Sequence, residues 1–167
     1  MEKFRRIALF SLFSLIFTYA GLGVFFIFCP FEQHFDTLTF IKYWQIVDGY
    51  MGKRMPIFGM ITIGTFITNL IVFFKTRKIS PIFWIILACF VMIIVDVVFT
   101  AQNQTPINQY IQTLDMNNLK SEQLAQLQGL RDQINQNFGF RDYLQWAMFL
   151  LMSVTPYLLA KLEQKIK

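Results

Sequence analysis

Charged residues, cysteine and histidine are scarce in this chain of 167 residues. Only 15% of its residues are charged, and it holds 2 cysteines and 1 histidine, whereas an average soluble domain has about 25% charged residues. Two cysteines cannot support a disulfide-stapled scaffold. The sequence also lacks zinc-ligand spacings, phosphate-binding glycine loops and any basic face with interleaved aromatic residues. We therefore expect no metal site and no nucleic-acid partner, and the sequence does not identify a cofactor.

Apolar residues make up 55% of the chain, and 20 of them are phenylalanine. They gather in four segments, about residues 7–29, 55–74, 81–101 and 143–159. Since a helix rises ~1.5 Å per residue, about 20 residues cross the hydrocarbon core of a bilayer. The last segment is short, but Tyr143 and Trp146 at one end suit the membrane interface. We predict an all-α protein: one integral membrane domain over residues 1–167, a bundle of four transmembrane helices whose main partner is the lipid bilayer.

The distribution of lysine and arginine predicts the orientation of the bundle. Three short tracts hold nine of these residues: Lys3, Arg5, Arg6, Lys75, Arg77, Lys78, Lys161, Lys165 and Lys167. The two longer loops, residues 30–54 and 102–142, hold six. By the positive-inside rule both termini face the cytoplasm, and we expect a multi-pass protein of a bacterial inner membrane. A cleaved signal peptide is the alternative for the first segment, but its apolar run continues well past Ala20, which favours an uncleaved helix.

Two cysteines and a few polar residues within the apolar segments have a structural interpretation. Cys29 is expected at the outer end of the first segment and Cys89 near the middle of the third, too far apart for a disulfide. Asn69 and nearby threonines of the second segment commonly tie membrane helices together. We expect all of these groups to serve packing.

The two longer loops carry helical patterns of their own. In the first, residues 35–51 have apolar residues at roughly helical spacing. The second has 15 Asn or Gln among 41 residues, yet one apolar stripe runs through it: Leu124, Leu127, Leu130, Ile134 and Phe138. This stripe predicts an amphipathic helix over residues 121–138 that leads into the fourth segment, with Ser121 as its N-cap. We expect Pro106 to end the third helix. The loops would thus form an ordered, partly helical polar crown on the outer side.

Five residues are candidates for a site at the outer end of the bundle. Asp96 lies inside an apolar span, where an acid is costly and usually faces the bundle interior. It serves either a helix–helix hydrogen bond or a ligand pocket. Arg141, at similar depth, either snorkels to water or clamps an acidic or phenolate ligand. Gln104 and Asn108 flank the proline turn, and His34 lies just after the first segment. We take Asp96 and Arg141 as candidate catalytic residues, and His34, Gln104 and Asn108 as candidate substrate-binding residues.

Several short motifs together resemble a known family. They are YAGLGVFFIFCPF in the first segment, WQIVDGYMGKRMPIFG before the second, VVFTAQNQTPINQYI after the third, and an arginine before the fourth. In this order they resemble the anthrone-oxygenase-like four-helix membrane proteins, with Gln104 in place of an asparagine of the family's Asn-x-Pro-x-Asn turn. The resemblance implies an oxidoreductase that oxidises an activated aromatic carbon of an apolar small molecule. Asp96 or Arg141 would then promote deprotonation or stabilise the resulting anion.

Two other functions remain open from the residues. The bundle could bind an apolar metabolite or lipid without reacting with it. It could also be a subunit of a homo-oligomer or membrane complex that uses the helix at 121–138 as its contact surface. Enzyme and binder both require Asp96, Asn108 and Arg141 to converge beside an apolar pocket. An assembly subunit requires an exposed leucine stripe instead.

Overall fold

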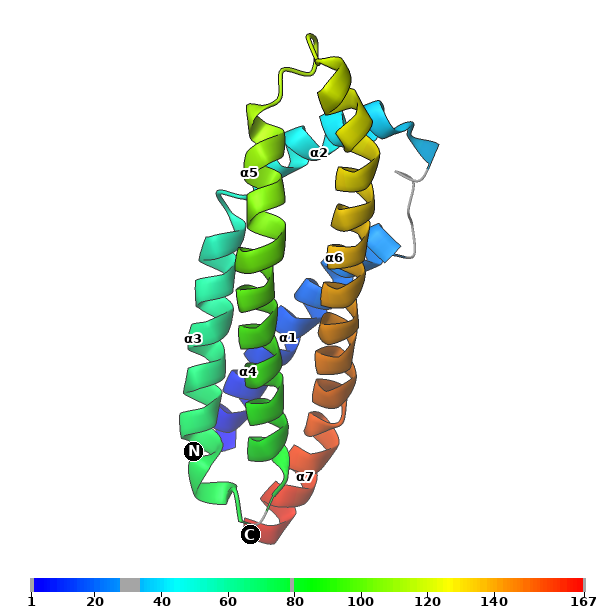
Figure 1. Cartoon of the computed structure of the whole chain (residues 1–167). Helices are drawn as coiled ribbons and strands as arrows, with labels where there is room; N and C mark the ends of the chain where they lie inside the picture. Colours follow the sequence, from blue (N-terminus) through cyan, green and yellow to red (C-terminus); the bar gives the residue numbers. More distant parts are fainter. Residues whose placement is uncertain (1, 28–33, 79, 167) are drawn as a thin grey trace.

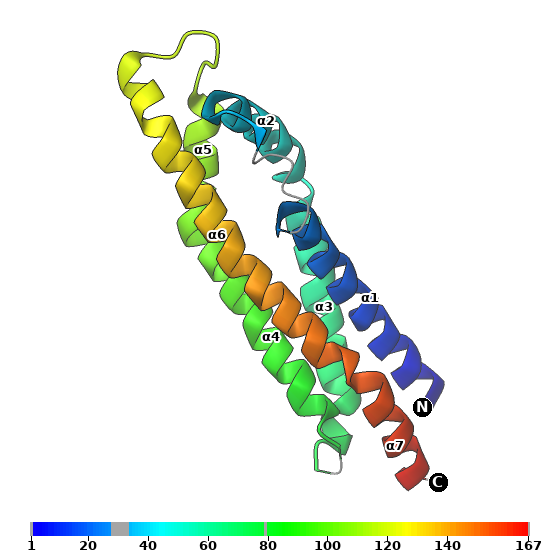
Figure 2. The same ribbon diagram turned by 90° about the vertical axis from the view of Figure 1, so that its right-hand side faces the viewer.

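The fold is a bundle of long helices with a helical cap at one end (Figure 1). The computed structural model describes residues 2–27, 34–78 and 80–166, and this part of the chain contains no strand. The elements are α1 (Glu2–Ile27), α2 (Thr37–Met51), α3 (Met55–Phe73), η2 (Phe74–Thr76), α4 (Ile82–Phe99), η3 (Thr100–Gln104), α5 (Thr105–Thr113), α6 (Ser121–Ser153) and α7 (Thr155–Ile166). Both termini lie at the end opposite the cap (Figures 1 and 2).

Four helical stretches are long and apolar enough to cross a membrane, which confirms the predicted all-α bundle. They are Glu2–Gly21, Met55–Thr76, Ile82–Thr113 and Ser121–Lys165. The fourth differs in detail from the predicted segment, because α6 ends at Ser153 and the chain resumes as α7 beyond Val154. Pro156 follows this break at once, where its missing N–H is tolerated in a first helical turn. The last two residues of the first predicted segment, 28 and 29, lie outside the described residues.

The bundle buries apolar side chains inside and presents others outside. Its inner cluster includes fully buried Phe66, Phe73 and Met148. Phe10 and Ile71 are each 71% exposed on the outer surface. A helix that is apolar all round is typical of a membrane span, since lipid can cover the outward side chains.

Among the polar groups of the second span, Asn69 ties two helices together as predicted, whereas the threonines do not. The hydroxyls of Thr62, Thr65 and Thr68 each donate to a carbonyl four residues back on α3 itself. Asn69 is fully buried, and its Nδ2 donates to the backbone oxygen of Ala8 at 2.9 Å, which ties α3 to α1. Cys89 is a buried free thiol whose sulfur lies 3.8 Å from the Met148 carbonyl oxygen. The other cysteine, Cys29, lies outside the described residues.

The cap corresponds to the predicted polar crown, which we define as α2, α5 and the first half of α6. These helices share a second apolar cluster: Phe40, Ile41, Trp44, Ile111, Leu114, Leu127 and Ile134. The α6 stripe therefore packs inward, and Leu127 and Ile134 are 2% and 1% exposed. At the start of the stripe, Leu124 is 49% exposed. The N-cap prediction was one residue off. Lys120 occupies that position, and its backbone N–H donates to the side-chain oxygen of Gln123 at 2.9 Å.

Pro106 does not end the third long helix, contrary to the prediction. The rod continues from α4 through η3, a π-helical turn, into α5. In η3 the Thr105 N–H bonds to the Thr100 oxygen, five residues back. The wider turn makes room for the proline ring, which would clash with a carbonyl four residues back in a regular α-helix. The turn also leaves Gln104 facing the bundle interior, only 1% exposed.

Candidate functional site

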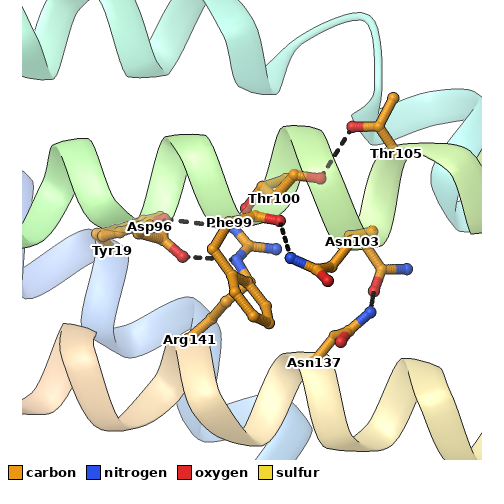
Figure 3. Close-up of polar contacts among 9 residues, drawn as sticks. Tyr19, Asp96, Phe99, Thr100, Asn103, Thr105, Asn137 and Arg141 are labelled. Atoms are coloured by element: carbon orange, nitrogen blue, oxygen red, sulfur yellow. Dashed lines mark hydrogen bonds and ion pairs between the residues drawn. The ribbon is translucent and has the colours of Figure 1, made fainter.

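Three helices bring polar side chains together toward the crown end of the spans. The Arg141 Nε of α6 donates to Asp96 Oδ1 of α4 at 2.8 Å. The hydroxyl of Tyr19, from α1, donates to the other carboxylate oxygen of Asp96, and Arg141 Nη2 lies 3.3 Å from that hydroxyl. Figure 3 shows the three side chains pointing toward one another. We call Tyr19, Asp96 and Arg141 the triad.

The triad is buried, and its charges are balanced. Asp96 is 1% exposed and the Arg141 side chain 12%. A buried carboxylate is tolerated when a cation and further hydrogen bonds compensate for its lost hydration. Arg141 has five N–H donors, of which two are used within the described part of the chain. Its remaining donors have no hydrogen-bond partner among the described residues.

A second polar network lies one step outward, in the crown. The Asn108 side-chain oxygen accepts from Trp44 Nε1 at 3.0 Å and from Gln104 Nε2 at 2.6 Å. Asn108 in turn donates to Asp48 at 2.6 Å, and Asn137 of α6 donates to Gln104 at 3.1 Å. This crown network (Trp44, Asp48, Gln104, Asn108 and Asn137) joins α2, η3, α5 and α6. It fixes the crown on the spans.

Aromatic rings connect the triad to the crown network. The Arg141 guanidinium carbon lies 5.0 Å from the centre of the Phe138 ring. Phe138 packs edge-on against Trp44 at 5.0 Å between ring centres, and Trp44 bonds to Asn108. A flat aromatic surface thus stands beside the free donors of Arg141, a combination that suits the recognition of an aromatic molecule with a polar oxygen.

Three buried oxygen atoms around the triad have no hydrogen-bond partner among the described residues. They are Thr100 Oγ1, one turn outward from Asp96, Asp142 Oδ2, next to Arg141, and Gln145 Oε1, one turn inward on α6. Buried polar groups without partners are rare in native proteins, and each one calls for a physical explanation. Here all three lie on helices of the triad, within four positions of Asp96 or Arg141.

Four of the five predicted site residues belong to these two groups. Asp96 and Arg141 pair directly, and Gln104 and Asn108 share the crown network. His34 belongs to neither group: it is exposed just before α2. Sequence reasoning missed Tyr19, Asp48 and Asn137. A tyrosine hydroxyl inside an apolar span was the one signal that could have revealed Tyr19, since buried tyrosines usually find a hydrogen-bond partner.

Other features of the described residues lie apart from this site. One groove of about 460 Å³ runs between α1 and α7 near the termini, lined by Leu9, Phe13 and Leu159 among others. None of the five predicted site residues lines it. Within the described ranges, no three His, Cys, Asp or Glu side chains are grouped to hold a metal ion.

Comparisons with protein-family models, with curated proteins and with solved structures found no match to this chain.

Proposed function

We propose that the protein binds an apolar aromatic small molecule at the triad and oxidises an activated carbon of it. The observation that carries the proposal is the buried triad, built from three helices, in which Arg141 keeps free N–H donors. Membrane-embedded ion pairs are costly and commonly mark functional sites. The resemblance of the sequence to the anthrone-oxygenase-like membrane proteins supplies the reaction class.

The geometry suggests a division of labour within the triad. Asp96 accepts one hydrogen bond on each carboxylate oxygen, from Arg141 and from Tyr19, so it serves to orient the two donors. Arg141 would hold the ligand's carbonyl oxygen and stabilise the negative charge that develops there on deprotonation of a neighbouring carbon. Phe138 and Trp44 offer ring surface for the aromatic body. In the implied oxygenation, dioxygen converts a CH2 group to a carbonyl, and the second oxygen atom leaves as water.

Binding without reaction is the nearest alternative and uses the same residues. An assembly role through the leucine stripe has less support, because α2 and α5 of this same chain cover Leu127 and Ile134.

The test compares wild-type protein with Arg141→Lys. Lysine keeps the positive charge beside Asp96 but loses the guanidinium fork that would bind the ligand oxygen. Each purified protein is incubated with anthrone, a tricyclic aromatic ketone with an activated CH2 group, in detergent under air. Product formation and oxygen uptake are then measured. We expect turnover by the wild type and at least about a tenfold loss in Arg141→Lys, consistent with a lost charged hydrogen bond of about 1.5–3 kcal/mol.

The matched control is Arg77→Lys, the same substitution at the residue that follows η2, near the end opposite the crown. It should turn over like the wild type. Equal turnover in wild type and Arg141→Lys, or none in either, would contradict the proposed reaction. Binding of anthrone without turnover in the wild type would favour the alternative of a non-enzymatic binder.

The location of the protein belongs to the same proposal. We place the crown outside and both termini in the cytoplasm of a bacterial inner membrane, on the basic-residue count. Single cysteines introduced at Lys42 and Asn117 of the crown should react with an impermeant maleimide in intact cells. A cysteine at Lys75 should react only after the cells are opened. Labelling of Lys75→Cys from outside would reverse the orientation.

A further inference from the structure

The groove between α1 and α7 lies far from the triad and has no part in the proposed function. The start of α1 and the whole of α7 run side by side at the end of the molecule where both termini lie (Figure 2). The groove has a volume of about 460 Å³, and most of the side chains that line it are apolar. It opens on the outer surface, where Phe10 is 71% exposed. Because α1 is a membrane span, lipid covers this surface.

The groove is charged at one end and apolar along the rest. Arg6 and Glu163 form an ion pair across it, with N–O distances of 2.8 and 2.5 Å. This pair marks the end nearest to the termini, because α1 begins at Glu2 and α7 ends at Ile166. Phe13 lines the deeper part, about 10 Å further along α1 at ~1.5 Å per residue. One leaflet contributes about 15 Å of the hydrocarbon core, so the groove follows much of the depth of one leaflet.

Positive charge prevails around the charged end. The first six and the last seven residues of the chain hold six basic and two acidic residues, and one of the two acids, Glu163, is already paired with Arg6. The Arg6 side chain is 61% exposed, and its Nη1 has no hydrogen-bond partner among the described residues. Lys3 is exposed three positions earlier, on the same face of α1 and one turn closer to the terminus. An anion at this end would therefore meet two accessible cations.

Arg5 is a second observation that points to an anion at this end. It is only 8% exposed, and its Nε has no hydrogen-bond partner in the described part of the chain. The ion pairs found in the same part do not include it. A buried guanidinium without a counter-charge is costly. Basic pockets between membrane helices are known to take the headgroups of anionic lipids, which supply such a charge.

We propose that the groove binds an anionic phospholipid. One acyl chain lies along the apolar walls formed by Leu9, Phe13 and Leu159, and the phosphate lies at the charged end, against Lys3 and Arg6. A soluble anion has no use for the apolar walls, and an uncharged apolar molecule has no use for the basic end. The site is separate from the triad, so the inference goes beyond the proposed function and is tested independently of it.

The test counts bound lipids by native mass spectrometry. The purified protein in detergent is titrated with phosphatidylglycerol, or with phosphatidylcholine that carries the same acyl chains. We expect the wild type to bind one phosphatidylglycerol with at least about tenfold higher affinity, since each nearby basic residue contributes about fivefold. Glycerol 3-phosphate in excess should not displace the lipid, because it has no acyl chain.

Two variants locate the lipid, and each has a matched control. Ala160→Trp puts a bulky ring into the groove and should weaken the binding of both lipids at least about tenfold. Leu150→Trp, at a 61% exposed position of α6 outside the groove, should bind like the wild type. Lys3→Gln should lower the affinity for phosphatidylglycerol about fivefold and leave that for phosphatidylcholine unchanged. Lys75→Gln, at an exposed lysine of η2, should change neither. The melting temperature of each variant shows that it is folded.

Each contrary outcome overturns the proposal. Equal affinity of the wild type for the two lipids would remove the recognition of the headgroup, and equal losses in Lys3→Gln and Lys75→Gln would reduce it to overall charge. Unchanged binding in folded Ala160→Trp would exclude the groove, and displacement by glycerol 3-phosphate would indicate a soluble anion. A wild-type dimer that binds no phosphatidylglycerol would mean that a second copy covers the groove. If Ala160→Trp fails to fold, Lys3→Gln still decides, because Lys3 is exposed.

Discussion

The ion pair of Asp96 with Arg141 allows a quantitative prediction about stability. Removal of one partner from a buried pair costs about 3–5 kcal/mol, because the other charge stays buried without compensation. The two single substitutions differ in what they leave behind. Asp96→Asn leaves an arginine side chain that is 12% exposed, whereas Arg141→Gln leaves an aspartate side chain that is 1% exposed. We therefore expect Asp96→Asn near the lower end of that range and Arg141→Gln near the upper end.

A double-mutant cycle isolates the pair. In the double variant, two neutral amides replace two charges, so its loss of stability should be clearly smaller than the sum of the single losses. Tyr19→Phe removes one hydrogen bond to the carboxylate and should cost about 1.5–3 kcal/mol. Stability is measured as the temperature at which the detergent-solubilised protein leaves its monodisperse peak in size-exclusion chromatography.

Asp132→Asn serves as the control, because Asp132 is exposed on the same helix as Arg141. It should change stability by less than about 0.5 kcal/mol. If Asp96→Asn and Asp132→Asn have the same melting temperature within experimental spread, the reasoning is refuted, since the ion pair would then contribute nothing to the stability of the fold.

Three further predictions concern the crown. Leu127→Ala should destabilise the protein by about 2–5 kcal/mol because Leu127 is 2% exposed, whereas Leu124→Ala, at a site 49% exposed, should leave thermal stability nearly unchanged. Asn108→Ala should lower the melting temperature in detergent, because it removes one hydrogen bond from each of three side chains, Trp44, Gln104 and Asp48. Gln109→Ala, the same substitution at an exposed position, should not lower the melting temperature. The pKa of Asp36 is lowered because its carboxylate accepts hydrogen bonds from the hydroxyl and the N–H of the residue three positions on, at the start of α2. Its stabilising contribution is present at pH values above about 4, the ordinary carboxyl value, and is lost as the pH falls through the lowered pKa. Amide protection at the start of α2 should drop with it, but stay constant in Asp36→Asn, which keeps a good cap.

The sequence was sufficient for the spans and for much of the crown because both depend on simple periodic patterns. Apolar length predicts a membrane helix, and the stripe through Leu127 and Ile134 predicts an amphipathic one. The sequence also placed Arg141 at a depth similar to that of Asp96, and an acid within an apolar span needs a partner.

Local rules failed where tertiary contacts decide the outcome. Pro106 was expected to stop a helix, but a π-turn absorbs it and the crown network holds Gln104 and Asn108 in place. His34, chosen as the single histidine and for its place just after the first segment, is exposed and lies outside both polar groups. Tyr19 was missed because the partner of a tyrosine hydroxyl lies 77 residues away in the chain, and no spacing rule connects the two.

The crown determines the geometry of the triad as well as covering it. α6 runs without a break from Ser121 to Ser153, so it carries crown contacts and site residues on one rod. Ile134 is fixed against α2 and α5, and Arg141 follows it after two turns, about 10 Å along the helix axis. Asn137, between them, bonds to Gln104, whose own position depends on the π-turn. A shift of the crown would move Arg141 relative to Asp96, which is anchored on α4. The polar residues of the crown therefore contribute to the site as well: they set where the guanidinium of Arg141 stands.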